Sequence, residues 1–344
     1  MNSMSFQRGR DPKYSMGIGQ KAKIQKWLEE RGILNYSLND DLTVDIHGDV
    51  PFRVDLKSLP SYIKFNKVSG NFSCEIRFLK TLDGSPNEVG GIFNCSSNLI
   101  SSMKGGPKKV GELFCNNNHL SSFEYFPIVE NGLSISGNKF KTFTTFENVP
   151  KKLNFLNCSR NRFTSLTGAP EVTDIFFCSY NKLNSLEYEH KITAKEFSCS
   201  HNQLKSLKGL SIKESTNFDC SYNKLISLEY APKIVEGNYD CSHNQLKSLK
   251  GAPKKVRGSF HCNHNQLEDL TGAPVRVNWR FNCSHNQLTS LTGAPKVVLL
   301  GFDCSFNNLD SLENSGIEKI AGDFSCFKNK IVFTEEYVRK NIPD

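Results

Sequence analysis

Cysteine and histidine, two residue types that often bind metals or carry redox chemistry, recur at a fixed interval in this chain. The six consecutive intervals between Cys178 and Cys304 are identical in length, and four histidines follow a cysteine by two residues. The chemistry to weigh is therefore disulfide formation, metal ligation or redox exchange. The cysteines are Cys74, Cys95, Cys115, Cys158, Cys178, Cys199, Cys220, Cys241, Cys262, Cys283, Cys304 and Cys326.

The spacing of these cysteines argues against that chemistry. No CxxC pair and no short metal-ligand spacing occurs, and the neighbouring imidazoles have no carboxylate or thiolate placed to complete a site. A single recurring position is typical of small buried hydrophobic residues in a reducing cytoplasm. We predict no metal and no cofactor, and we favour this packing role over a redox or metal-binding ladder of thiols.

The regular interval marks an internal repeat of about 21 residues, a length typical of solenoid proteins. Counting one unit in which Ile135 takes the cysteine position, there are thirteen units, and twelve of them have Asn three residues after that position. Apolar residues stand five and eight residues after the cysteine position, and Phe, Tyr or Leu usually stands two residues before it. The central asparagines are Asn181, Asn202, Asn223, Asn244, Asn265, Asn286 and Asn307.

The pattern F-x-C-x-x-N-x-L-x-x-L matches the signature of leucine-rich repeats. The alternating F-x-C segment predicts a short strand, and the Asn side chain can bond backbone groups where the chain leaves it. Recurrent G-A-P segments predict an extended outer segment, because proline lacks a backbone donor. We expect an α/β-type solenoid that is mostly β: an arc with a parallel concave sheet, extended convex segments and a short helical cap at each end.

The ends of the chain differ from the repeats and set the predicted boundaries. Residues 18–32 place apolar residues on one helical face before Gly32, and Leu42, Val44 and Ile46 alternate as in a strand. Thr334 can cap a terminal helix. We expect a flexible extension over 1–15, a cap helix, strand and degenerate first repeat over 16–70 (the last from Val54 to Val68), a solenoid over 71–332 and a cap over 333–344.

The position two residues after the cysteine is the candidate site. It is occupied by large side chains that we expect at the edge of the concave face, where exposed aromatic residues favour binding of a partner. The other concave positions predict a mildly polar surface without a charge cluster. The candidate partner-binding residues are Arg160, Tyr180, His201, Tyr222, His243, His264, His285 and Phe306.

Charge and motifs exclude several other functions. The net charge is +8, from 43 Lys plus Arg against 35 Asp plus Glu, and it is spread along the chain. The sequence contains no GxSxG, HExxH, P-loop or dinucleotide-binding motif in the strand and helix context that such a motif requires. We therefore expect no catalysis. No apolar run is long enough to span a membrane and no secretory signal is present, which predicts a cytoplasmic protein without a membrane partner. The outer lysines are Lys108, Lys109, Lys151, Lys152, Lys233, Lys254 and Lys255.

Two resemblances extend this interpretation. From Cys74 to Cys326 the units are similar to the short leucine-rich repeats of bacterial type III effectors of the YopM and IpaH kind, which implies protein binding. No residues remain here for the ubiquitin-ligase domain of the IpaH-like members. From Met16 onward, the segment MGIGQKAKIQKWLEERGILNYSLNDDLTVDIHGDV and units such as CSHNQLTSLTGAP resemble leucine-rich-repeat proteins of large tailed bacteriophages. That resemblance implies production in bacterial cytoplasm and makes Met16 an alternative start.

These observations lead to one main hypothesis and two alternatives. The main hypothesis is a non-catalytic scaffold that binds another protein, such as a host or defence factor of a phage. The first alternative is a structural component of a virion, and the weaker one is nucleic-acid binding through the outer lysines. The sequence does not identify the partner or the oligomeric state.

Overall fold

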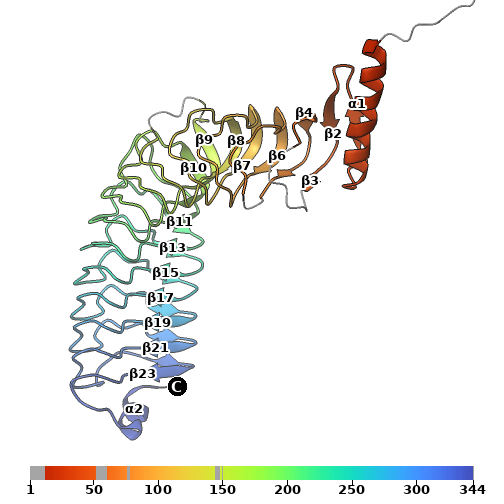
Figure 1. Cartoon of the computed structure of the whole chain (residues 1–344). Coiled ribbons are helices and arrows are strands. Elements are labelled where there is room, and N and C mark those ends of the chain that lie inside the picture. Colours follow the sequence, from red (N-terminus) through yellow and green to blue (C-terminus); the bar gives the residue numbers. More distant parts are fainter. Residues whose placement is uncertain (1–11, 52–59, 76–77, 144–147, 149, 344) are drawn as a thin grey trace, which may run out of the picture. The chain divides into compact units, whose positions relative to one another are not determined.

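The structure, a computed structural model, describes residues 12–51, 60–75, 78–143, 148 and 150–343 (Figure 1). The chain divides into two compact units. Unit 1 comprises residues 1–120 and 124–130, and unit 2 comprises residues 121–123 and 131–344. Each unit is a series of chain turns in which a short strand recurs once per repeat, as the sequence pattern predicts.

Unit 1 begins with the predicted cap helix, α1 (Pro12–Glu29). It starts earlier than residue 18, so residues 12–15 of the predicted flexible extension are helical, and residues 1–11 lie outside the described part. Gly32 ends the helix: its φ is +70°, and its N–H donates to the Glu29 carbonyl. Trp27 is buried and meets the Phe65 ring edge-on at 6.1 Å between centroids. The helix therefore covers the start of the sheet.

A hairpin follows α1, which the sequence analysis did not predict. Strand β1 (Tyr36–Leu38) runs antiparallel to β2 (Thr43–Ile46), and β2 pairs in parallel with β4 (Lys64–Val68). Leu42, expected in the strand, lies in the turn with a φ of 65°. Of the predicted degenerate first repeat, β4 is described, whereas residues 52–59 lie outside the described residues.

The remaining strands of unit 1 are parallel. They are β3 (Val50–Pro51), β5 (Phe72–Ser73), β6 (Glu88–Asn94) and β7 (Lys109–Phe114). Strand β8 (Ile128–Ser134) has residues in both units. The pairing of β6 with β7 shifts register between Val89 and Ile92, so a bulge divides the strand into two parts.

In unit 2, β9 and β10 still pair with such a bulge, and from β12 onward two separate parallel ladders replace the single bulged strand. The main ladder contains β9 (Lys152–Asn157), β10 (Glu171–Phe177), β11 (Glu196–Ser198), β13 (Phe218–Asp219), β15 (Tyr239–Asp240), β17 (Phe260–His261), β19 (Arg280–Asn282), β21 (Gly301–Asp303) and β23 (Asp323–Ser325). The second contains β12 (Glu214–Ser215), β14 (Ile234–Val235), β16 (Lys255–Val256), β18 (Arg276–Val277), β20 (Val297–Val298) and β22 (Lys319–Ile320). The sequence analysis predicted the first ladder and missed the second.

The core of unit 2 is built from the same few positions in every turn. In the turn around Cys283, the side chains of Phe281, Cys283 and Leu288 are fully buried. Rings at the Phe281 position stack between repeats, as Phe260 does on Phe281 at 5.4 Å between centroids. Since no turn can bury these residues without its neighbours, the repeats stabilise one another.

The repeated asparagine joins adjacent turns through its buried side-chain amide. Asn244 Oδ1 accepts the N–H of Leu225 at 2.9 Å, and Nδ2 donates to the carbonyls of Cys220 and Cys241, each at 3.1 Å. Asn98 in unit 1 and Asn329 in the last turn make the same three bonds. One side chain thus bonds backbone groups of two turns. It supplies the partner of the Leu225 N–H, and the Cys220 and Cys241 carbonyls each accept a second bond from another asparagine of the series.

The chain closes on α2 (Glu335–Asn341), which lies beside β23 (Figure 1). Thr334 is its N-cap, because Oγ1 accepts the N–H of Tyr337 at 3.2 Å. Within the described residues, no helix has both the length and the apolar content needed to cross a membrane.

Replacing Asn244 with alanine is expected to destabilise unit 2 by about 2 kcal/mol, because the buried Leu225 N–H loses its partner and the Cys220 and Cys241 carbonyls each keep one of their two amide donors. Urea unfolding followed by circular dichroism measures the change. The matched control is Asn308→Ala, since Asn308 is exposed one residue after the ladder position of its own turn. Equal effects of the two substitutions would contradict the role of the amide.

Candidate interaction surface

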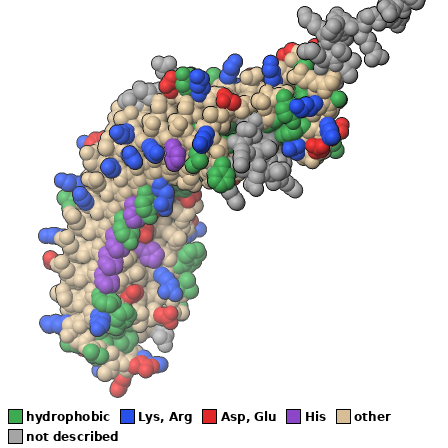
Figure 2. Space-filling model, viewed as in Figure 1, with side chains coloured by type: hydrophobic (Ala, Val, Ile, Leu, Met, Phe, Trp, Pro, Cys, Tyr) green, Lys and Arg blue, Asp and Glu red, His purple; other side chains and the backbone are tan. Residues whose placement is uncertain are grey.

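The large side chains two residues after the cysteine form one continuous stack, which we call the ring column: Arg160, Tyr180, His201, Tyr222, His243, His264, His285 and Phe306. Figure 2 shows the histidine and hydrophobic side chains of unit 2 as a single band. From Tyr180 to Phe306, each pair of successive ring centroids is 3.9–4.2 Å apart, with interplanar angles of 10–15°. The Arg160 guanidinium lies over the Tyr180 ring at 4.3 Å.

The backbone explains why the rings stack. Every residue of the column has a left-handed backbone, with φ between 51° and 55°. Its N–H donates to the next turn, as in the 2.9 Å bond from His243 to the Asn263 carbonyl. Each turn therefore fixes the same direction for its side chain. In the turn around Ile135 this position is Gly137, also at positive φ, which was the sequence signal that could have revealed the conformation.

The spacing of the rings places the column on the inner side of a curve. Core rings at the Phe281 position lie 5.1–5.8 Å apart between centroids, whereas successive column rings lie only 3.9–4.2 Å apart. A stack of turns that is tighter along one edge bends toward that edge. Within unit 2, the column therefore lies along the more tightly spaced edge of the stack, and its role in binding a partner stays a prediction.

The column is open to solvent along its length. Tyr180 is 42% exposed, Tyr222 44% and Phe306 40%. Because the faces of the rings cover one another, a partner would contact the ring edges. These edges present apolar carbon atoms, phenol hydroxyls and imidazole nitrogens. Stacking has already restricted the side-chain rotamers, so little conformational entropy remains to be lost on binding.

Burial within the stack lowers the pKa of three histidines below the ordinary value of 6.5. Partial desolvation is the main cause for His201, His243 and His264. Neighbouring imidazoles lower the pKa of His264 further, while the Asp240 carboxylate opposes the shift at His243. At neutral pH the side chains of His201, His243 and His264 are therefore mainly uncharged.

This shift predicts that unit 2 loses stability in mild acid. The histidines of the folded state bind protons more weakly than those of the unfolded chain. The stability that the neutral histidines contribute is therefore complete above about pH 6.5, and it is lost as the pH falls through their lowered folded-state pKa values. The midpoint of urea unfolding should therefore decrease between pH 7.5 and 5. The double variant His243→Tyr and His264→Tyr should show a flatter pH profile than wild type. A double variant with the wild-type slope would refute the assignment.

The left-handed backbone makes a second prediction at His264, whose φ is 53°. Both His264→Ala and His264→Gly lose the ring, but only alanine keeps a Cβ, which costs about 1–2 kcal/mol in this conformation. The greater freedom of glycine in the unfolded chain offsets about 0.4–1 kcal/mol of this difference. We expect the glycine variant to be the more stable by roughly 1 kcal/mol in urea titrations. A more stable alanine variant would contradict a strained backbone here.

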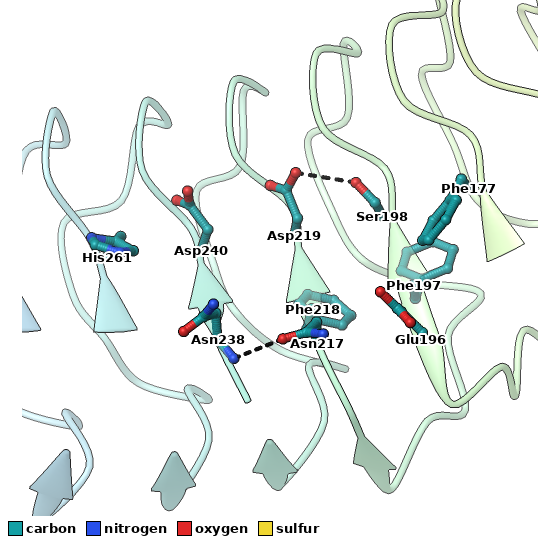
Figure 3. Close-up of a pocket in the computed structure, with 10 residues that line it drawn as sticks. All are labelled: Phe177, Glu196, Phe197, Ser198, Asn217, Phe218, Asp219, Asn238, Asp240 and His261. Carbon is teal, nitrogen blue, oxygen red and sulfur yellow. Dashed lines mark hydrogen bonds between the residues drawn. The ribbon is translucent and has the colours of Figure 1, made fainter. Parts of the chain in front are cut away.

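Beside the column, a pocket of about 450 Å³ opens on the solvent-facing side of the main ladder (Figure 3). Glu196, Asp219 and Asp240 lie around it together with His261, and Phe177 forms one end. This corrects the sequence analysis, which predicted no charge cluster on this face. Asp219 and Asp240 occupy the same position in successive turns and Glu196 comes from the turn before, so the stacking of repeats brings the carboxylates together.

Hydrogen bonds hold the carboxylates in place. Asp219 Oδ2 accepts from Ser198 Oγ at 3.1 Å, and Asp240 Oδ1 accepts the N–H of Ser242 at 2.8 Å. Burial raises the pKa of Asp240, and the negative charge of Asp219 adds to this effect. A cationic group entering the pocket would relieve both costs.

The outer lysines, by contrast, are partly neutralised. Lys109 Nζ lies 2.7 Å from Glu130, and Lys152 lies 3.4 Å from Glu171 on the neighbouring turn. Lys255 lies 3.9 Å from Glu236. Alternating charges of this kind weaken the attraction that a row of free lysines would have for phosphates.

The cysteines have the environment of packed apolar residues. Eleven are buried, and Cys326 in the last turn is partly exposed. Burial raises the pKa of the Cys74 thiol to about 12, so the thiol stays protonated and unreactive at neutral pH. Across the described residues, no group of three His, Cys, Asp or Glu side chains is arranged to hold a metal ion. The stacked imidazoles direct their lone pairs along parallel planes instead of toward one point.

The parallel ladders, the asparagine network and the Phe, Cys and Leu core define a leucine-rich-repeat solenoid. No protein-family model matches the chain, and no curated protein does. Among solved structures, YopM from Yersinia enterocolitica WA-314 is similar, with 19% identity, a TM-score of 0.58, and coverage of 90% of this chain and 73% of that chain. The leucine-rich-repeat domain of APL1B matches at 18% identity and a TM-score of 0.46, covering 75% of this chain and 81% of its own. The likeness to YopM shows the fold.

Proposed function

We propose that this protein is a non-catalytic interaction scaffold that holds another protein along the ring column and the adjoining carboxylate pocket. The observation that carries the proposal is the continuous, solvent-open stack from Tyr180 to Phe306 on a backbone fixed by hydrogen bonds in every turn. Aromatic side chains held rigidly at a surface contribute much of the binding energy at protein interfaces.

The chemistry of the surface indicates the kind of segment it would hold. Its ring edges suit apolar and hydrogen-bonding side chains, and Glu196, Asp219 and Asp240 suit a lysine or arginine. The column and the pocket share their turns, and they are close enough for Asp240 to raise the pKa of His243 against the effect of burial. One extended segment of a partner could therefore contact both.

The resemblance of the sequence to bacteriophage leucine-rich-repeat proteins supports a finer proposal. On that basis we place the protein in the cytoplasm of a bacterial host, where the partner would be a host or defence protein. The partly neutralised outer lysines make the nucleic-acid alternative weaker.

The test is capture of a partner by matched variants. Tagged wild-type protein is incubated with nuclease-treated lysate of the native host, and bound proteins are identified by mass spectrometry. We expect a stoichiometric protein that binds wild type and the outer-surface variant Lys254→Gln. The variants Tyr222→Ser with His243→Ser, and Asp219→Asn with Asp240→Asn, should each bind the purified partner at least tenfold more weakly, because central interface residues typically contribute about 2 kcal/mol or more.

Three results would count against the proposal. Equal binding by all variants would move the interface away from the column. Loss of binding in Lys254→Gln with retention in the column variants would place the interface on the outer surface. Capture of particle proteins alone would favour the virion role.

A further inference from the structure

Stacking of the repeats gathers five exposed basic side chains on three successive turns of unit 2, at the end of the ring column where Tyr180 lies. Four of them stand four or six residues after the cysteine position, and the fifth belongs to the column itself. In Figure 2, Lys and Arg side chains lie beyond one end of the band of histidine and hydrophobic side chains. We call these five residues the basic patch: Lys139, Lys141, Arg160, Arg162 and Lys182.

Hydrogen bonds between turns hold three of these side chains at one position of the stack. The N–H of Arg162 donates to the Phe140 carbonyl, and that of Lys182 donates to the Phe163 carbonyl, each at 2.8 Å. Lys139, Arg162 and Lys182 therefore follow one another along neighbouring turns, which lie about 4.8 Å apart. Side chains of like charge that start this close repel each other.

The last turns of unit 2 carry opposite charges at positions where the basic patch carries only positive ones. Lys330 stands four residues after its cysteine, and its Nζ lies 2.9 Å from the carboxylate of Asp310, six residues after the preceding cysteine. Arg162 and Lys141 occupy the equivalent two positions. The patch thus has the arrangement of an ion pair in which a second cation takes the place of the acidic residue.

The chain supplies no counter-charge to the basic patch within the residues that the structure describes. Between residues 131 and 186, the described carboxylates belong to Glu171 and Asp174. Each pairs with a lysine outside the patch: Lys152 at 3.4 Å and Lys195 at 3.1 Å. No ion pair to any of the five patch residues occurs in this described part. An anionic ligand would therefore relieve a repulsion that the fold leaves in place.

The surroundings of the basic patch favour an acidic protein segment over nucleic acid as this anion. Proteins that bind single strands usually offer open ring faces on which bases stack. Here the Arg160 guanidinium covers the Tyr180 ring at 4.3 Å, and the rings beyond it cover one another. A nucleic-acid strand along the column would also meet the carboxylates of Glu196, Asp219 and Asp240. We propose that the basic patch binds a segment rich in Asp or Glu, which belongs to the protein held along the ring column.

This inference rests on the proposed function and names the chemistry of the partner at one end of the site. Arg160 belongs to both the basic patch and the ring column, so one extended segment passes from the first to the second. The carboxylate pocket lies further along the same turns. The partner segment is therefore acidic where it meets the patch and carries a lysine or arginine toward the pocket, which fixes its direction along the solenoid.

Fluorescence anisotropy of a labelled peptide of ten glutamates, titrated with the full chain, tests the patch. We expect wild type to bind the peptide with an affinity that falls as salt is added. The patch variant combines Lys139→Gln, Arg162→Gln and Lys182→Gln. It should raise the dissociation constant roughly tenfold, because each exposed ion pair contributes a factor of about two to three.

The control variant removes three charges of the same kind from the outer surface of unit 2. Lys213, Lys233 and Lys254 are exposed and occupy one position in successive turns, since the N–H of each later lysine donates to the carbonyl of the one before. Their joint replacement by glutamine should leave peptide binding within about twofold of wild type, because surface charges far from the patch are screened by salt. At low salt, the patch variant should unfold at a urea concentration at least as high as the control variant, because it loses a repulsion.

The outcomes that would overturn the proposal are distinct. They are absence of peptide binding by wild type at low salt, equal weakening by the patch and control variants, and a patch variant that unfolds at lower urea than the control. Tighter binding of a thymidine decamer than of the peptide would assign the patch to nucleic acid instead. If the partner capture succeeds while the peptide test fails, the proposed function stands and this inference alone is wrong.

Discussion

The buried asparagine amide is the interaction on which the solenoid depends. A turn that leaves its strand after two or three residues has backbone groups that no ladder can satisfy. The amide solves this because it offers an acceptor and two donors at one point, and it uses them on two successive turns. Neither aspartate nor leucine could replace it, since the first lacks the donors and the second has no polar group. Packing of Phe, Cys and Leu supplies apolar burial, but the amide fixes the register in which the turns stack.

The candidate site follows from that register. Once each turn is fixed relative to the next, the second residue after the cysteine is forced into a left-handed conformation, and its side chain meets those of the turns on either side. Ring stacking at 3.9–4.2 Å is thus a product of the backbone, with the residue type free to differ between Tyr, His and Phe. The carboxylate pocket arises in the same way, since residues one repeat apart become neighbours on one face.

Most of the fold could be predicted from the sequence because it is periodic: the cysteine interval, the Asn and the alternating apolar residues locate the main strands. The second ladder was missed because segments such as Glu214–Ser215 are very short and carry no alternation. The hairpin before the first repeat was missed because its turn depends on the positive φ of Leu42, which side-chain type does not reveal. The column residues were identified by their shared position, but their stacking and their left-handed backbone required the coordinates. The charge cluster was overlooked because Glu196, Asp219 and Asp240 were judged within single repeats and not across them.

The contacts of the asparagine network reach only from one turn to the next, and this has a consequence for how such a chain can change over generations. Duplication or deletion of the gene segment that encodes one repeat would leave each remaining turn with the same neighbours and the same bonds. The protein could therefore gain or lose length in whole turns without any need to redesign its interior. Each such event would also add or remove one ring from the column, so the extent of the recognition surface would vary in steps of a single side chain.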